Sequence, residues 1–194
     1  MNLDEWRHFL WAQALGETHA SIADDIAKLW LQLRYQYLAI APEVSTLLCK
    51  LRCHYLLGLI TNGPSRAQWE KVHTLNLRQY FDCILVSGDL PWEKPDQNIF
   101  LEACQYLGVQ PRNCLMVGDK LETDIAGGQK ASLGGTVWIP LSKESIVVFE
   151  EGPRPDFTLE SVTDLPLLLP AKSNISHLAC TDFEDCNSNA SDGS

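Results

Sequence analysis

The chain has 194 residues, of which 45% are hydrophobic, and a formal net charge of −10. This length allows one domain with a hydrophobic core, or one domain with a small appendage. The acidic balance argues against a general nucleic-acid-binding protein, which needs clustered positive charge. No apolar stretch reaches the about 18 residues of a membrane span, and the start lacks the layout of a signal peptide. Seven cysteines without a Cys-x-x-Cys pair favour reduced thiols in a cytoplasmic protein.

Hydrophobic periodicity divides the chain into three blocks. Residues 1–40 predict two helices, because apolar residues recur there every three or four positions. Residues 41–170 alternate helix and strand, with strands expected at 56–60, 84–86, 114–117, 136–139 and 157–159. This alternation predicts an α/β fold, in which a parallel sheet carries helices on both faces. Residues 171–194, rich in Ser, Asn and Asp, predict a disordered acidic tail.

Single residues mark the expected helix boundaries. Ser21 is a candidate N-cap for the second helix, and Pro42 suits the first turn of the third. Pro95 can open a later helix, which we expect to end at Gly108.

Polar side chains follow two of the expected strands at the point where each ends. Thr61-Asn62-Gly63 follows the first strand, and Gly118-Asp119 follows the third. Lys94 lies in the segment between them, and a second acid, Asp124, comes five positions after Asp119. Parallel sheets bind ligands at the carboxyl ends of their strands. A hydroxyl, an amide, a lysine and two carboxylates in this order therefore predict a phosphate and metal site.

Each motif also has an ordinary structural explanation. Thr61-Asn62-Gly63 can hold a phosphate through its hydroxyl and helix N-terminal amides, but these residues also suit helix caps and turns. Lys94 can neutralise a phosphate oxygen or a carboxylate, or it is a solvated surface lysine. Asp119 can bind a magnesium ion, while Asp124 orients its shell or pairs with Lys94. Both acids also fit N-caps at a strand-to-helix turn.

In this order the motifs resemble those of the haloacid dehalogenase superfamily. The strand before Thr61-Asn62-Gly63, Lys94-Pro95, and Gly118-Asp119 through Asp124 are similar to its second, third and fourth motifs. Residues 107–139 are closer still to the members of that superfamily that act on N-acylneuraminate 9-phosphate.

The resemblance covers residues 1–170 and implies a domain plan. Residues 1–40 would be part of a helical cap, and residues 41–170 a Rossmann-like core of the haloacid dehalogenase type that lacks its first strand.

The resemblance also implies an activity: magnesium-dependent hydrolysis of a phosphorylated sugar, N-acylneuraminate 9-phosphate, in sialic acid biosynthesis. By motif match, Thr61-Asn62-Gly63 would hold the phosphoryl group. Lys94 would be the catalytic lysine that stabilises the nucleophile and the phosphate. Asp119 would bind Mg²⁺, and Asp124 would support the metal.

One motif of the superfamily is absent from these residues. There the first strand ends in Asp-x-Asp-x-Thr, whose first aspartate is the nucleophile and whose second is the general acid/base. No apolar run of this chain ends in Asp-x-Asp, so we expect a truncated form without turnover. Two other hypotheses are a non-catalytic remnant that binds phosphate or a partner, and a phosphatase of another sugar phosphate or a nucleotide. Without that strand, its two neighbours would lie about 10 Å apart with unpaired edges, or would close up and pair.

Overall fold

This computed structural model describes residues 3–141 and 152–169, so the predicted tail at 171–194 lies outside the described residues. The described strands are all short, and each begins and ends within two residues of its expected position: β1 (Gly58–Thr61), β2 (Cys83–Val86), β3 (Leu115–Gly118), β4 (Gly135–Trp138) and β5 (Phe157–Thr158). Every pairing between them is parallel, which confirms the α/β class.

Helices separate the strands along the chain. The α-helices are α1 (Leu3–Leu15), α2 (Ala23–Leu38), α3 (Pro42–Arg52), α4 (Ser65–Thr74), α5 (Gln97–Leu107) and α6 (Ala126–Lys130). Short 3₁₀ turns are η1 (Ala20–Ile22), η2 (Leu77–Gln79), η3 (Ser87–Asp89), η4 (Pro111–Asn113) and η7 (Val162–Leu167). A π-helical turn, η5 (Leu121–Ile125), leads into α6.

Two of the four boundary predictions are confirmed. Pro42 occupies the first turn of α3. Gly108 ends α5 in the left-handed conformation, with φ of 67°, which a residue with a side chain adopts only with strain.

The other two boundary predictions are wrong. Ser21 does not cap α2, because it lies inside η1, and the N-cap is Ile22 without a side-chain hydrogen bond. Pro95 does not open α5. The Asp96 side chain accepts a hydrogen bond from the Asn98 N–H at 2.8 Å, so the capped helix begins after Asp96.

The sheet is in two parts, which is one of the two arrangements expected without a strand between β1 and β3. β1 pairs with β2, and the other part has the order β3-β4-β5. Within residues 3–141 and 152–169, no strand pairs with the second edge of β1 or of β3. Among the described residues the inner edges are therefore unpaired, as one of the two expectations had it, and the alternative in which β1 and β3 close up and pair is wrong. One edge group is satisfied by a side chain instead, since the Ile60 carbonyl accepts a hydrogen bond from Lys94 Nζ at 2.9 Å.

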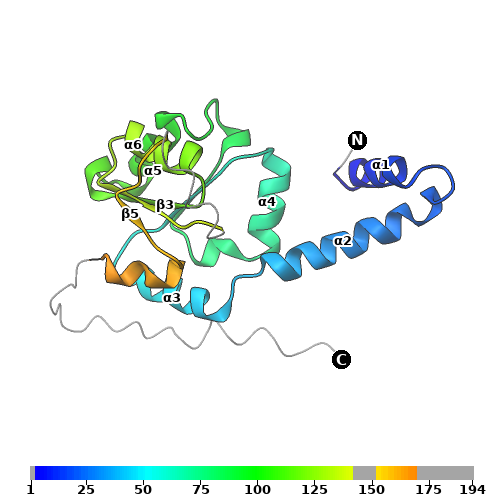
Figure 1. The fold of residues 1–194 in the computed structure, drawn as a ribbon, viewed down its shortest axis with the longest axis horizontal. Helices are drawn as coiled ribbons and strands as arrows, with labels where there is room; N and C mark the ends of the chain where they lie inside the picture. Colours follow the sequence, from blue (N-terminus) through cyan, green and yellow to red (C-terminus); the bar gives the residue numbers. More distant parts are fainter. Residues whose placement is uncertain (1–2, 142–151, 170–194) are drawn as a thin grey trace.

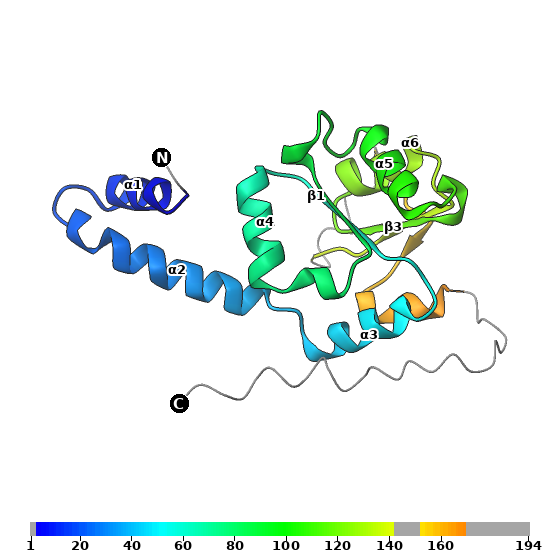
Figure 2. The same ribbon diagram turned by 180° about the vertical axis from the view of Figure 1, so that it is seen from behind.

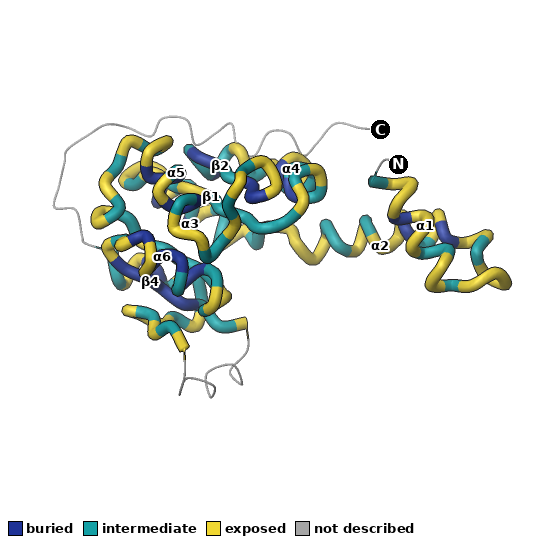
Figure 3. The backbone as a smooth tube through the Cα atoms, turned by 90° about the horizontal axis from the view of Figure 1, so that it is seen from above, coloured by how far each residue is buried: buried dark blue, intermediate teal, exposed yellow. Residues whose placement is uncertain are grey.

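Helices cover both faces of the two-part sheet (Figure 1, and from behind in Figure 2). On one face, α5 buries Ile99 and Phe100 against side chains of both parts, Ile60 and Leu85 from one and Met116 from the other. On the other face, α3 and η7 form a second cluster with β4. All four residues of β4 are buried, whereas β1 and β3 are partly exposed (Figure 3).

The first two helices project from this core as an arm (Figure 1). Arg7 of α1 ties the arm to α4, because its guanidinium donates to both carboxylate oxygens of Glu70 at 2.9 and 2.8 Å. The Tyr35 hydroxyl of α2 donates to the same carboxylate. These hydrogen bonds hold the pKa of Glu70 below its ordinary value, although burial acts in the opposite direction. No helix of the described residues is long and apolar enough to cross a membrane.

Candidate active site

The loop after β1 folds back on α4 through the side chain of Gln68. Thr61 Oγ1 donates to Gln68 Oε1, and Gln68 Nε2 donates to the Asn62 carbonyl, both at 3.0 Å. Gly63 has φ of 135°, and a Cβ there would lie 2.4 Å from Gln68 Nε2, so a side chain at this position would collide with the glutamine. The N-cap of α4 is Pro64, so the alternative that Thr61, Asn62 or Gly63 caps the helix is wrong.

The Asn62 side chain fixes the backbone of Lys94. Its Nδ2 donates to the Lys94 carbonyl at 2.8 Å, and its Oδ1 accepts from the Lys94 N–H at 2.9 Å. The Lys94–Pro95 peptide bond is cis. Because both the oxygen and the nitrogen of the amide bond the backbone of Lys94, the Asn62 side chain positions this lysine.

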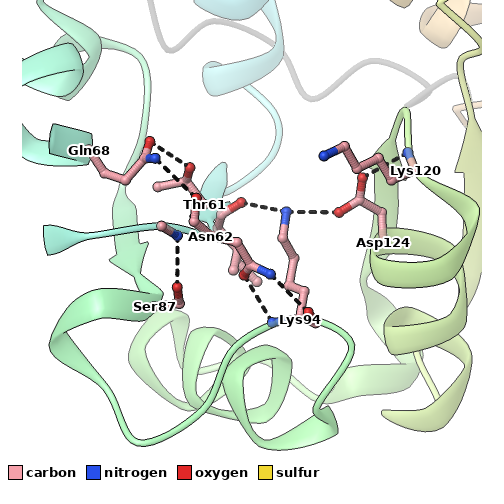
Figure 4. Close-up of polar contacts among 9 residues, drawn as sticks. Thr61, Asn62, Gln68, Ser87, Lys94, Lys120 and Asp124 are labelled. Carbon is pink, nitrogen blue, oxygen red and sulfur yellow. Dashed lines mark hydrogen bonds and ion pairs between the residues drawn. The ribbon is translucent and has the colours of Figure 1, made fainter. Parts of the chain in front are cut away.

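Lys94 is not a surface lysine, since its side chain is only 12% exposed. Its ammonium lies between the two parts of the sheet, where it donates to the Ile60 carbonyl of β1 at 2.9 Å. On the other side it meets Asp124 Oδ1 at 2.8 Å (Figure 4). An ammonium has three N–H donors, so at least one is left for a further oxygen beyond these two contacts.

Asp124 is buried on the β3 side of this pair, with 5% of its side chain exposed. Its Oδ2 accepts from the Lys120 N–H at 3.1 Å. Its Oδ1 has no partner in hydrogen-bond geometry, so the ammonium at 2.8 Å holds it by charge. A Cβ at position 118 would lie 2.3 Å from Oδ2, which explains the glycine at the end of β3. The N-cap alternative is wrong for Asp124, because it lies inside η5.

Asp119 is the first residue after β3 and is exposed to solvent. Its carbonyl accepts from Trp138 Nε1 of β4 at 2.9 Å, which fixes the main chain. Within the part of the chain that the structure describes, its carboxylate makes no hydrogen bond or ion pair with another residue. No contact joins it to Lys94 or Asp124, so the structure connects these two with each other but not with Asp119.

The donor set fits a magnesium ion with a single protein carboxylate. Mg²⁺ keeps several waters and binds through one or two carboxylates together with phosphate oxygens, and an exposed carboxylate without a protein partner has that chemistry. Asp124 is committed to Lys94 and Lys120. Among the described residues, no group of three or more His, Cys, Asp or Glu side chains converges as a metal site. Asp119 is therefore the available ligand.

Sequence reasoning missed the side chains that brace the loop after β1. Ser87 Oγ accepts from the Gly63 N–H at 3.0 Å, and Ser87 directly follows β2. The strand-end argument that selected Thr61 would also have selected Ser87, had it been applied to the second strand. Gln68 carries no such signal, because it lies inside α4. Lys71 Nζ donates to Gln68 Oε1 at 3.1 Å, and burial together with the nearby Arg34 holds the pKa of Lys71 below its ordinary value.

A hollow of about 580 Å³ lies elsewhere, between the arm and α4. Its lining includes Arg7, Tyr35, Arg66, Glu70 and His73, and none of the strand-end residues. The strand-end residues that the sequence selected therefore lie outside this hollow.

Comparisons with known proteins agree with this arrangement. Residues 3–132 match the family described as haloacid dehalogenase-like hydrolase. N-acylneuraminate-9-phosphatase of Homo sapiens is 41% identical over 164 residues, which is 82% of this chain and 65% of that protein. Glyceraldehyde 3-phosphate phosphatase of Methanopyrus kandleri is 37% identical over 101 residues, 52% of this chain and 43% of that protein. The chain thus spans less than two thirds of either relative.

A solved structure shares the fold. The hydrolase YfnB of Bacillus subtilis, described as bound to magnesium, has a TM-score of 0.60 at 23% identity, over 87% of this chain and 73% of that one. The family match extends over more than half of the chain, on a parallel α/β core whose strand-end motifs occur in the expected order. The chain belongs to the family of haloacid dehalogenase-like hydrolases.

Proposed function

We propose that this chain carries the phosphate-binding part of a phosphomonoester hydrolase whose substrate is N-acylneuraminate 9-phosphate. The observation that carries the proposal is the buried Lys94 ammonium at the strand ends, which has one donor left for a phosphate oxygen. The substrate is suggested by the 41% identity to the human enzyme named for it.

In this proposal the residues divide into two roles. Lys94 neutralises a phosphoryl oxygen, and Asn62 keeps that lysine in place through its backbone. The Thr61 hydroxyl, which donates to Gln68 in this structure, rotates to donate to a phosphoryl oxygen. Positioning and charge stabilisation of this kind are most of what a protein contributes to phosphoryl transfer.

Asp119 would hold a magnesium ion, with Asp124 as an indirect support through the Lys94 pair. A bound magnesium ion would neutralise charge on the phosphoryl oxygens. With one protein carboxylate as ligand, we expect millimolar or weaker affinity. Isothermal titration should give that affinity, lost in Asp119→Ala and reduced in Asp124→Ala. Micromolar affinity, or affinity indifferent to Asp119→Ala, would mean that the ion binds elsewhere.

We further infer that the 194-residue chain binds phosphate without turning over substrate. Among the described residues, Lys94 forms an ion pair with Asp124. No second described carboxylate forms an ion pair with this ammonium and could serve as the nucleophile. The non-catalytic alternative, a protein that only binds phosphate or a partner, starts from the same observation.

The test compares the chain with a version preceded by a strand ending in Asp-x-Asp-x-Thr. Phosphate release from N-acylneuraminate 9-phosphate is measured with magnesium, beside glyceraldehyde 3-phosphate and a pyrimidine nucleotide. We expect release by the extended version alone, lost in Lys94→Met. Turnover by the short chain that Asp119→Ala abolishes would refute the inference of inactivity. An extended version that folds but releases no phosphate would favour the non-catalytic alternative, and preference for another compound would change the substrate.

A further inference from the structure

Two thiols lie close together near the end of α5 and the start of β3. Lys94 precedes α5 and Asp119 follows β3, so the thiols are at the opposite ends of these elements. Cys104 lies on the buried side of α5, and Cys114 directly precedes β3. Their sulfur atoms are 3.7 Å apart, and the Cys104 thiol donates to Cys114 Sγ. The Cys114 thiol donates in turn to the Gln110 carbonyl at 3.5 Å. None of the described cysteines is in a disulfide.

The two thiols differ in access. Cys104 is only 6% exposed, whereas Cys114 is half-buried. Burial, with the hydrogen bond to Cys114 as a second cause, raises the pKa of Cys104 to about 12, so Cys104 stays a thiol. Because a small oxidant reaches the more exposed sulfur first, Cys114 is the thiol that reacts first.

We propose that Cys104 and Cys114 form a reversible disulfide when the protein meets a peroxide, and that this bond fastens the end of α5 to the start of β3. The Cys114 thiolate attacks one oxygen of hydrogen peroxide, the O–O bond breaks, and Cys114 becomes a sulfenic acid. The hydroxide that leaves takes up the proton released by the Cys114 thiol and becomes the first water. Cys104 sulfur then attacks Cys114 sulfur. The S–S bond forms, the S–O bond breaks, and water leaves with the Cys104 proton. One peroxide is reduced to two waters while two thiols are oxidised to one disulfide.

The surroundings favour the second step. The neighbouring Cys114 sulfur is part of what keeps Cys104 protonated. Oxidation of Cys114 removes its thiol from beside Cys104, and the two sulfur atoms are already 3.7 Å apart. An S–S bond is about 2.05 Å long, so the two side chains must rotate toward each other to form it.

The other described cysteines lie in different surroundings. Cys53 follows the last residue of α3, and its thiol donates to the main-chain oxygen of Cys49 at 3.4 Å. Cys83 is buried in β2, where burial raises the pKa of its thiol. The bridge would lie at the opposite ends of α5 and β3 from Lys94 and Asp119. We therefore expect it to leave phosphate binding unchanged.

The test is mild treatment of the whole chain with hydrogen peroxide, followed by alkylation and peptide mapping without reductant. We expect one cross-linked peptide pair joining residues 104 and 114 and a mass fall of about 2 Da, reversed by a dithiol. Cys114→Ser should abolish the cross-link, Cys53→Ser should leave it intact, and Cys104→Ala should let dimedone trap a sulfenic acid at Cys114. Stepwise oxidation of Cys114 to the sulfinic acid in the unaltered protein, or a cross-link that persists in Cys114→Ser, would overturn the proposal.

Discussion

The ion pair between Lys94 and Asp124 gives the sharpest test of how the two parts of the sheet are held together. Asp124→Asn keeps the size of the side chain and removes its charge. The Lys94 ammonium then loses its anionic partner but keeps the Ile60 carbonyl. The asparagine oxygen can still accept the Lys120 N–H that Asp124 Oδ2 now accepts. Its NH2 group then stands where Oδ1 faces the Lys94 ammonium, so the substitution removes both the charge and the acceptor of the pair at nearly unchanged size.

The expected loss of stability follows from distance and burial. Nζ and Oδ1 are 2.8 Å apart, and the side chains are 12% and 5% exposed. At an effective dielectric constant of about 20, unit charges at 2.8 Å attract by about 6 kcal/mol. Desolvation offsets part of this attraction, and removing one partner of a buried pair lowers the free energy of unfolding by about 3 kcal/mol. At about 3 °C for each kcal/mol, Tm should fall by about 9 °C.

The assay is urea and thermal unfolding of the unaltered chain, Asp124→Asn, Lys94→Met and the double variant. The double-mutant cycle should give an interaction energy of about 2 kcal/mol between the two positions. Lys130→Met, which removes an exposed lysine of α6, is the matched control and should change stability by about 0.5 kcal/mol at most. A loss below that value in Asp124→Asn, or strictly additive effects, would refute the idea that this pair joins the two parts.

Two further predictions concern the sheet edges and the arm. Backbone amides of β1 and β3 should exchange hydrogen with solvent faster than those of β4, because β4 pairs with strands on both sides and β1 and β3 with one strand each. Equal protection of the three strands would mean that another segment covers the edges. The lowered pKa of Glu70 stabilises the fold above the ordinary glutamate pKa, and this is lost as pH falls through the lowered value. Glu70→Gln should thus lower Tm at pH 7 and reduce the decrease of Tm at acidic pH. A decrease of Tm with falling pH that is the same in the variant and the unaltered chain would count against the Arg7 contact.

Much of the fold could be predicted from the sequence, because periodicity reports which residues are buried. The strands lie where apolar runs end in turn residues, and Gly108 marks a left-handed position that few other residues tolerate. The break in the sheet was one of two expectations, because periodicity does not show whether the strands beside a missing one stay apart or pair. Only the three-dimensional arrangement shows that β1 and β3 do not pair with each other, and that a lysine side chain, not a strand, bonds the Ile60 carbonyl.

The candidate site could be predicted in its residues but not in its connections. The order of the motifs along the chain selected Lys94 and Asp124, and their pairing was among the alternatives. The sequence did not indicate that the Asn62 amide would be used on the lysine backbone, because an amide suits a ligand and a main chain equally well. Gln68 was missed for a related reason: a glutamine within a helix carries no local signal of what it contacts.

The same ion pair connects stability with ligand binding, and the connection can be measured. Asp124 compensates the Lys94 charge, and its own negative charge repels an incoming phosphate. If Lys94 is the phosphate-binding cation, Asp124→Asn should bind inorganic phosphate more tightly than the unaltered chain in the absence of magnesium, although it is less stable. Lys94→Met should lose both stability and binding. Calorimetric titration well below the Tm of each variant separates the two effects. Weaker binding in folded Asp124→Asn would mean that the carboxylate, and not the lysine alone, organises the phosphate site.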